Sequence, residues 1–554
     1  MRALSIFPGG FTAAAARHVL GGGDVVAVLT QLADQSLLKV TDTVSGTRFR
    51  MLETVREFST AHRERAGETG RAVDGLMAWA REFGTAEAQS VFGADLVPAA
   101  ERVRAEQDNL VLALRHGLQR ADDATVVAAA AVLAALWGVQ GNFVRMTGLT
   151  KDTAWYLSHV RPTPRTAETT HTAVLLCAMA DYLMRGPLPL RLLVTLRRLP
   201  PAPAGTLMGA ADTVVRAMIE DLGALDALCA SDEPLVAGVA SGAASYVYEQ
   251  RQDIEGALRA ARTTLAVFGS RATPWMRAVA HSRIGELCLQ LGRGEEAGAH
   301  LVETLAVLDA LREPGVSSGA SRVRGAMALA NLQRGAVDEA EHWLEPAAHG
   351  EGDTAADLFM FGSSVRAEIL LARGDVEEGL ALWRRVAGRL RDTAGSGEAT
   401  GELPGSASWA LEVHATAVIA HARHDRLDLV PDLVGDLPGV LADLLDGPAA
   451  GPEIGEPVRG ALLLALAVAD LDRARRTADA ALTAAAVRMI ALAEALRFLR
   501  EFQPTMSATH ARDLAEQSDA AAYAEAGAAY AGLDRDALRA AASAALRART
   551  AAAG

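Results

Sequence analysis

The chain has 554 residues, of which half are apolar, 5% are aromatic and 22% are charged. This length allows several domains, and the abundance of Ala and Leu favours closely packed helices over sheets, because both are strong helix formers. The net charge of −14 repels phosphate backbones, so nucleic acid is not the expected partner unless the sequence concentrates a basic patch.

The cysteines and the N-terminus favour a cytoplasmic location. Cys177, Cys229 and Cys288 are odd in number and far apart, which fits a reducing compartment and no disulfide framework. The sequence starts without a long apolar segment, so we expect no signal peptide. The stretch from Thr125 to Gln140 is apolar but too short to predict a membrane span, and we expect it to be a buried helix.

The first 20 or so positions of the chain begin a small domain. Thr12 can cap a helix over residues 13–20, which Gly21-Gly22-Gly23 ends. Asp24 can cap a second helix, Asp24 to Gln35. The apolar face expected for this second helix consists of Val25, Val28, Leu29 and Leu32.

A hairpin and a third helix follow. Residues 37–40 predict a short strand, residues 41–47 a turn, and residues 48–52 a return strand with alternating polarity. A helix resumes over residues 53–66. The order helix, helix, hairpin, helix predicts a winged-helix domain over residues 1–68.

From about Gly70 onward only helical patterns are found. Residues 99–118 are amphipathic, and long apolar runs then alternate with breaks rich in Gly, Pro or Asp, which predict exposed loops. These breaks are at residues 161–164, 199–203, 392–406 and 446–457.

One turn recurs in the middle of the chain as Leu-x-Arg-Gly, followed by acidic residues. Its glycines are Gly294, Gly335 and Gly374, with spacings of 335 − 294 = 41 and 374 − 335 = 39 residues. Helix pairs repeated at about 40 residues are typical of an α-solenoid. Similar turns are expected near residues 252–257 and 423–427.

Four segments resemble those of a known family. They are residues 4–12 (LSIFPGGFT), 48–58 (RFRMLETVREF), 106–110 (EQDNL) and 520–527 (AAAYAEAG). Together they are similar to the winged-helix and tetratricopeptide regions of actinobacterial regulators of the AfsR and LuxR-type STAND ATPase class. In that family a nucleotide-binding domain precedes the winged helix, and the repeats are thought to sense input and restrain the ATPase switch. The resemblance therefore implies a separate or missing nucleotide-binding domain as a partner.

The sequence excludes a P-loop. That motif needs a Lys followed by Ser or Thr to bind phosphates and Mg²⁺, but Lys39 and Lys151 are followed by Val40 and Asp152. By the resemblance, Met51-Leu52-Glu53 takes the place of a Met-His-Asp motif whose His contacts ADP. Leu52 has no donor, so we expect Met51 and Leu52 to pack in the core.

DNA binding through the winged helix is the alternative function. A helix of such a domain can enter the major groove, but the helix from Asp24 to Gln35 has no Lys or Arg. We expect this helix to pack against protein, while Lys39, Arg48 and Arg50 decorate the wing.

Other patterns with chemical meaning are interpreted as structural. Residues 315–319 match a nucleophile elbow but fall in a loop between helices, and Ser36-x-x-Lys39 lacks the other β-lactamase motifs. His414, His421, His424 and Asp425 could hold a metal, but a solvated helix end is the preferred interpretation. Trp275, Trp343 and Trp383 are expected in the cores of helix pairs.

The predicted fold is mostly α: a winged-helix domain (residues 1–68), a helical connector (69–120), tetratricopeptide-like repeats (121–500) and C-terminal capping helices (501–554). The predicted function is a non-catalytic module that senses or scaffolds through the concave face of the solenoid, binding a protein or peptide there. No catalytic residue, metal, cofactor or membrane contact is expected.

Overall fold

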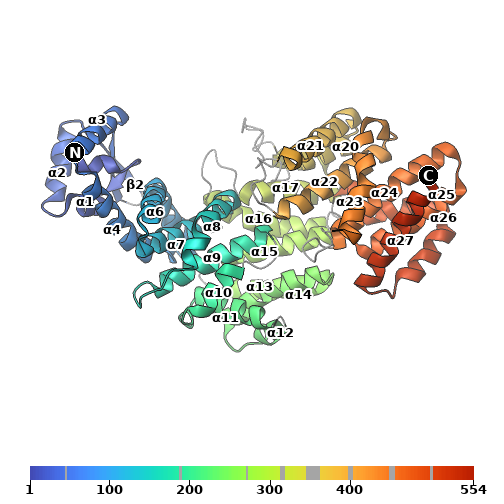
Figure 1. Ribbon diagram of the computed structural model, residues 1–554, viewed down its shortest axis with the longest axis horizontal. Coiled ribbons are helices and arrows are strands. Elements are labelled where there is room, and N and C mark those ends of the chain that lie inside the picture. The colour runs from blue at the N-terminus through green and yellow to red at the C-terminus, as the bar shows by residue number, and fades with distance from the viewer. Residues whose placement is uncertain are drawn as a thin grey trace.

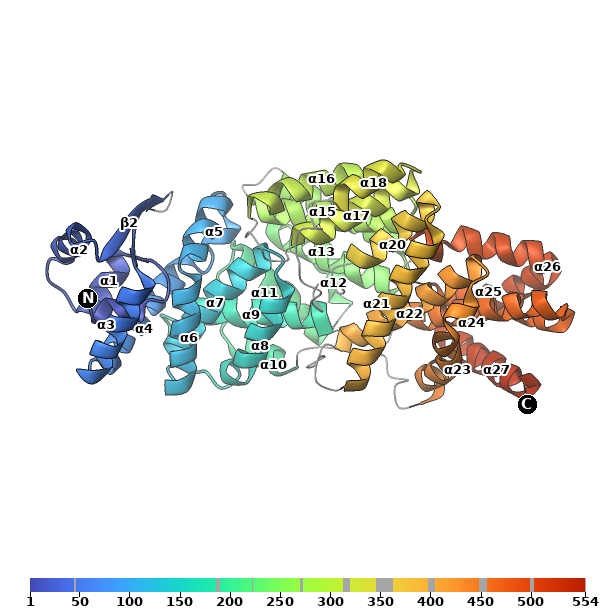
Figure 2. The ribbon, with the colours of Figure 1, turned by 90° about the horizontal axis from the view of Figure 1, so that it is seen from above.

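The computed structural model describes residues 1–43, 46–185, 190–221, 223–269, 273–311, 319–344, 362–396, 404–447, 456–498 and 503–553. The protein is an elongated, mostly α solenoid whose two termini lie near opposite ends of its long axis (Figures 1 and 2). In the described ranges the strands form one small sheet at the N-terminal end. The predicted fold class, a mostly α solenoid, is confirmed.

The N-terminal module contains the predicted order of helix, helix, hairpin and helix. Its three antiparallel strands have the order β1-β3-β2, and Val40 pairs with Phe49 across the hairpin. The side chains of Thr12 and Asp24 cap the two helices by accepting hydrogen bonds from Ala15 N and Ala27 N. The elements are η1 (Ala3–Ile6), β1 (Phe11–Thr12), α1 (Ala13–Leu20), α2 (Val25–Asp34), β2 (Leu38–Thr43), β3 (Gly46–Met51) and α3 (Glu53–Arg65).

The core of this module is aromatic and continues into α4 (Thr69–Glu87). Phe7 stacks on Phe11 with ring centroids 4.9 Å apart, and Trp79 of α4 meets Phe7 edge-on at 6.2 Å. A Cβ added at Gly75 of α4 would lie 2.6 Å from Cα of Val19, so the small residue allows α4 to pack closely on α1. The module therefore shares one core with the helix that follows it.

The remaining helices stack along the solenoid. A break at Glu106 separates α5 (Leu96–Ala105) from α6 (Gln107–Arg120). The others are η2 (Ser90–Phe92), α7 (Asp123–Val139), α8 (Phe143–Leu157), α9 (Ala167–Arg185), α10 (Leu190–Arg198), α11 (Leu207–Glu220), α12 (Ala224–Cys229), α13 (Pro234–Gln250), α14 (Ile254–Gly269), α15 (Pro274–Gln290), α16 (Gly294–Ala310), α17 (Gly319–Gln333), α18 (Val337–Leu344), α20 (Gly362–Arg373), α21 (Val376–Ser396), α22 (Pro404–Arg423), η4 (Leu427–Leu429), α23 (Pro431–Asp446), α24 (Glu456–Thr477), α25 (Ala480–Leu496), η5 (Pro504–Met506), α26 (Ala508–Tyr530) and α27 (Arg535–Ala553).

A left-handed residue ends the first helix of several pairs. Gly335 has φ +74°, and the following Ala336 N–H donates to Asn331 O at 2.9 Å, which closes the end of α17. Gly374 (φ +96°) and Gly292 (φ +70°) have the same role in α20 and α15. The prediction for Gly294 is wrong, because this residue is the first of α16.

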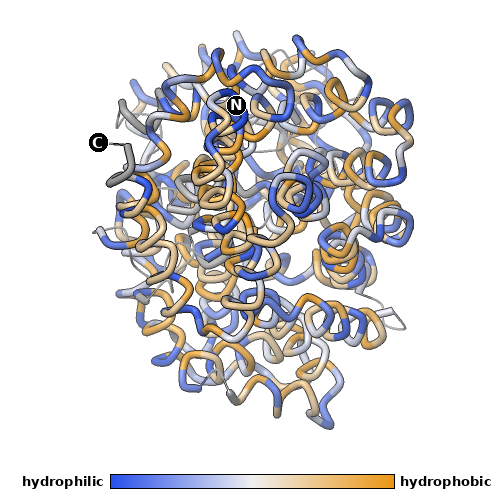
Figure 3. Tube along the Cα trace, turned by 90° about the vertical axis from the view of Figure 1, so that its right-hand side faces the viewer, coloured by the Kyte–Doolittle hydropathy of each residue, from blue (hydrophilic) through white to orange (hydrophobic). Residues whose placement is uncertain are grey.

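The apolar run near residues 125–140 is a buried helix, as expected. Of the 17 residues of α7, Thr125 to Trp137 and Val139 are all buried. Hydrophobic segments recur on helices throughout the molecule rather than in one band (Figure 3), as stacked helix pairs that share a core require. Within the described ranges, no helix is long and apolar enough to cross a membrane.

Most of the predicted loops lie between helices of the structure. Residues 161–164 separate α8 from α9, and residues 199–203 separate α10 from α11. The loop predicted for residues 392–406 is wrong at both ends, because α21 extends to Ser396 and α22 begins at Pro404. The Gly, Ser and Pro residues there weaken the helical sequence pattern, but they do not prevent helix formation at these ends.

Distant parts of the solenoid also meet. Arg104 of α5 donates to the carbonyl of Leu311 at 2.6 Å, and Gly319 N donates to the carbonyl of Gln140 at 3.1 Å. Near the other end, Arg535 donates to the carbonyl of Gln250 at 2.7 Å. Such contacts, between residues more than 150 positions apart, hold the solenoid in one curvature.

Candidate functional site

The N-terminal module is joined to the repeats by a buried ion pair. Arg48 of β3 lies 2.6 Å from Glu106, which separates α5 from α6. The other guanidinium nitrogen of Arg48 donates to the carbonyls of Gly10 and Ala105 at 2.8 and 2.7 Å. We call this group, together with Asn109, the joint.

Asn109 completes the joint. Its amide nitrogen donates to Gly10 O at 2.9 Å and to Glu106 at 2.6 Å. Burial raises the pKa of Glu106, and the hydrogen bonds from Arg48 and Asn109 offset this only in part. The joint thus holds a buried carboxylate that depends on Arg48 for its counter-charge.

The next residue of the same segment faces the repeats. Gln107 accepts hydrogen bonds from the indole of Trp137 at 2.7 Å and from Arg145 at 3.0 Å. The segment EQDNL at residues 106–110 has no sequence signal of its own apart from the family resemblance. The structure gives its polar side chains a physical role, because they connect the hairpin with α7 and α8.

The joint corrects the prediction for Arg48. This side chain does not decorate the hairpin but is buried at its base, with 11% of its side chain exposed. Lys39 and Arg50 do lie on the exposed hairpin, opposite each other in the register. Alternating polarity shows which face of a strand a residue takes, but not that a carboxylate 58 residues later lies against that face.

The outward face of α2 is uncovered among the described residues. Val25 and Leu29 face the module core, but Val26 is 57% and Val28 is 40% exposed. The prediction of Val28 on the buried face is therefore wrong. The expectation that α2 packs against protein holds for its inner face, which lies on α1 and β2.

Two other core predictions had mixed outcomes. Met51 is buried, as predicted, but Leu52 is 54% exposed, so its predicted core packing is wrong. Trp383 is fully buried in one apolar cluster, and Trp275 and Trp343 pack half-buried against another. The predicted placement of all three tryptophans in helix-pair cores is consistent with this packing.

The prediction of a solvated helix end is wrong for His421 but not for His424, which is half-buried in the turn after α22. His421 is fully buried, with Nδ1 2.7 Å from the carbonyl of Ala417 and Nε2 3.2 Å from Arg384. His414 contacts the carbonyl of Leu433. A guanidinium beside Nε2 opposes a metal cation there, and no three His, Cys, Asp or Glu side chains converge as metal ligands in the described part of the chain.

The short catalytic patterns gain no support. Residues 315–318 of the elbow-like sequence lie outside the described residues, and Gly319 begins α17. Lys39 is in β2, and Lys151 is in α8. The two lysines therefore lie on separate elements, one on a strand and one on a helix.

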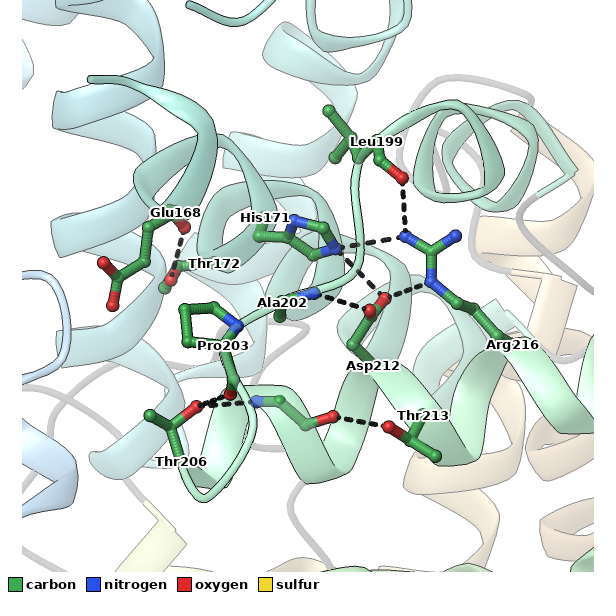
Figure 4. A network of polar contacts seen from close by, with 11 residues as sticks. Glu168, His171, Thr172, Leu199, Ala202, Pro203, Thr206, Asp212, Thr213 and Arg216 are labelled. Atoms are coloured by element: carbon green, nitrogen blue, oxygen red, sulfur yellow. Dashed lines mark hydrogen bonds and ion pairs between the residues drawn. The ribbon is translucent and has the colours of Figure 1, made fainter. Parts of the chain in front are cut away.

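A buried polar network that the sequence did not reveal lies between α9 and α11 (Figure 4). His171 and Arg216 contact the same oxygen of Asp212 at 3.1 and 2.8 Å, and Ala202 N–H donates to the other at 3.1 Å. Burial favours a higher pKa for Asp212, but these three hydrogen bonds together hold it below its usual value. Arg216 also donates to the carbonyl of Leu199, so the network fixes the proline-rich loop.

The fold defines a helical-repeat protein with a small N-terminal module. Part of its sequence is similar to bacterial proteins that are named as regulators. Three proteins named as HTH-type transcriptional regulators, from Mycobacterium bovis and two strains of Mycobacterium tuberculosis, are each 30% identical over 191 residues. The match covers 33% of this chain and 20% of each relative, so the chain spans about a fifth of their length. No family model matches the chain.

One solved structure also aligns with most of the chain. It is a Signal Transduction ATPase with Numerous Domains (STAND) protein with a tetratricopeptide repeat sensor, from Pyrococcus horikoshii. The alignment covers 94% of this chain and 64% of that one, with 12% identity and a TM-score of 0.41.

Proposed function

We propose that the chain is a non-catalytic regulatory and protein-interaction module of a STAND-type transcriptional regulator. In this proposal the N-terminal module is a winged helix that docks on protein. The solenoid senses or scaffolds by binding a protein or peptide on its concave face. A nucleotide-binding domain, on a separate or longer chain, would supply the ATPase switch in the cytoplasm.

The single observation that carries this proposal is the concentration of exposed apolar side chains on the N-terminal module. Among the described residues, ten large hydrophobic side chains are exposed, and five of them lie in the first 58 residues. Large exposed apolar surfaces mark protein interaction sites, and this module has half of the exposed large apolar side chains among the described residues. The five are Val26, Val28, Val40, Leu52 and Phe58.

The charge on α2 supports protein rather than DNA as the partner of this surface. The ends of α2 are marked by Asp24 and Asp34, and the helix has no Lys or Arg. α2 lies at the end of the molecule farthest from the repeats (Figures 1 and 2), so a large partner can reach it. The joint would then transmit the docked position of the module to the solenoid.

The alternative is a DNA-binding transcription factor. It is favoured by the names of the mycobacterial relatives and by the uncovered outer face of α2. Phosphate contacts need cations, and on the hairpin beside α2 the exposed cations are Lys39 and Arg50. We therefore prefer the protein-docking function.

A docking experiment tests the proposal. A purified STAND-type nucleotide-binding domain is titrated into the full chain and binding is measured by calorimetry. We expect saturable binding that Val26→Glu with Val28→Glu abolishes, because both side chains would place charge in the apolar contact. Val302→Glu is the matched control, since Val302 is equally exposed on α16. Absence of binding, or equal loss in the control, would contradict docking through α2.

A further inference from the structure

Two histidines face each other across one helix pair of the solenoid. His281 is on α15 and His300 is on α16, and their Nδ1 atoms lie 2.8 Å apart. The ring planes are 40° apart and the centroids are separated by 5.0 Å. Both rings are half-buried.

A hydrogen bond between these two nitrogens requires a particular pair of tautomers. One ring must carry its proton on Nδ1 and the other must leave Nδ1 bare, so the two rings must be opposite tautomers. When both rings carry their proton on Nε2, the two Nδ1 lone pairs come close together and repel each other. A metal ion between the rings would accept both lone pairs and remove this conflict, since neutral imidazole is the commonest metal ligand.

We propose that His281 and His300 form a binding site for one divalent transition-metal ion of the Ni²⁺ or Cu²⁺ type. This site goes beyond the proposed regulatory function and departs from the sequence-based expectation of no metal. The ion would bond to both Nδ1 atoms and take its remaining ligands from water.

The separation of the nitrogens selects the class of ion. With metal–nitrogen bonds of about 2.0 Å, two ligands at 90° lie about 2.8 Å apart, whereas a tetrahedral angle separates them by about 3.3 Å. The observed 2.8 Å fits the right angles of tetragonal sites, which Cu²⁺ and Ni²⁺ prefer. Tetrahedral Zn²⁺ would require the two Nδ1 atoms to move apart.

Burial is the main influence on the pKa of both rings. Burial lowers the pKa of both histidines, and the charge of a protonated His300 would lower the pKa of His281 further. Glu303, one turn after His300, is the acidic group that acts on both rings. Its negative charge favours a cation at this place.

Charges of both signs act on each ring from the neighbouring elements. Arg277 acts on His281, while Arg262 of α14 and Glu296 act on His300. Arg262 and Glu296 form an ion pair with each other, which offsets the effect of that arginine. The site therefore has one acidic group near both rings and one uncompensated cation at its edge.

The ion would connect α15 to α16 and stabilise this helix pair by mass action, since it binds the folded state. The test uses the untagged full chain after treatment with EDTA. NiCl₂ is titrated into the wild type and into His281→Asn and His300→Asn. His159→Asn is the control, because His159 is exposed after α8 and bonds only to its own helix end.

We expect one nickel site in the wild type and in the control, and a loss of affinity of about tenfold or more in each variant of the pair. Bound Cu²⁺ should show electron paramagnetic resonance couplings to two nitrogens in the wild type and to one nitrogen in each variant. Thermal unfolding in EDTA checks that the variants fold. An affinity that changes no more in the pair variants than in His159→Asn would overturn the proposal.

Discussion

The guanidinium of Arg48 lies 2.6 Å from the carboxylate of Glu106, and both side chains are almost fully buried. This pair joins the hairpin of the N-terminal module to the start of α6. Because the carboxylate is buried, it depends on Arg48 and on Asn109 for its stabilisation. The joint therefore adds a polar connection to the apolar core that the module shares with α4.

Loss of Arg48 should destabilise the protein strongly at neutral pH. Arg48→Met leaves Glu106 as a buried charge without its counter-ion, which we expect to cost about 3 kcal/mol in the free energy of unfolding. Arg50→Met is the matched control, because Arg50 is on the same strand but exposed, and it should change stability by less than about 0.5 kcal/mol. Urea denaturation measures both; equal effects would contradict the joint.

The cost of Arg48→Met should shrink in acid. Removing Arg48 raises the pKa of Glu106 further, so the folded variant binds a proton more readily than the unfolded chain does. The contribution of this carboxyl is then fully present below its unfolded pKa and is lost as the pH rises through the folded pKa. The difference between wild type and variant should be larger at pH 7 than at pH 4, and adding Glu106→Gln should recover part of the loss at pH 7. A difference that does not depend on pH would contradict this assignment.

The turn glycines should respond according to their backbone angles. Gly335 has φ +74°, so Gly335→Ala should lower stability by about 1 kcal/mol. Gly298 lies inside α16 with open space around it, so Gly298→Ala should raise stability by about 0.5 kcal/mol or more. Thermal unfolding of both variants gives the signs; the same sign in both would show that the conformation of the turn does not matter.

These glycines show what the sequence could and could not predict. The recurring turn and the caps Thr12 and Asp24 are local signals, and the structure confirms them. Periodicity could not decide between Gly292 and Gly294, which stand two residues apart. Only the structure shows that a Cβ at Gly294 would lie 2.6 Å from the carbonyl of Ala330 on α17.

The interactions at the candidate sites could not be predicted from the sequence for a different reason. Arg48 with Glu106 and His281 with His300 are pairs from separate elements, and no spacing within one helix reveals them. His421 lies in the last turn of α22 and His424 lies in the turn that follows, and their spacing in the sequence alone suggested a shared site. Helical patterns predict which elements form, but partner choice depends on how the helix pairs stack.

The thiols should be poorly reactive in the native protein. Burial raises the pKa of Cys177 to about 11 and the pKa of Cys288 to about 12. At pH 8 both remain protonated and covered, and a thiolate is the reactive form. Titration with a disulfide reagent should modify at most Cys229, which is half-buried, until denaturant exposes all three. Rapid reaction of all three native thiols would contradict the packing described here.

The chain should not bind ATP. Lys39 lies on a strand of the hairpin and Lys151 lies on α8, so neither can stand in a phosphate-binding loop. Calorimetry with Mg²⁺ and ATP on the pure chain should show no heat of binding. Micromolar binding would show that nucleotide contacts come from residues outside the P-loop pattern.

The central claim, that the N-terminal module docks on protein rather than on DNA, is tested most directly by fluorescence anisotropy with duplex DNA. At physiological salt we predict no binding, because α2 has no cation and the acidic chain repels phosphate. At low salt a weak, salt-sensitive signal is expected. Nanomolar, sequence-selective binding that is lost when Lys39 and Arg50 are changed to Glu would contradict the account. Arg48 is left intact in this test, because its role in the joint would confound the result.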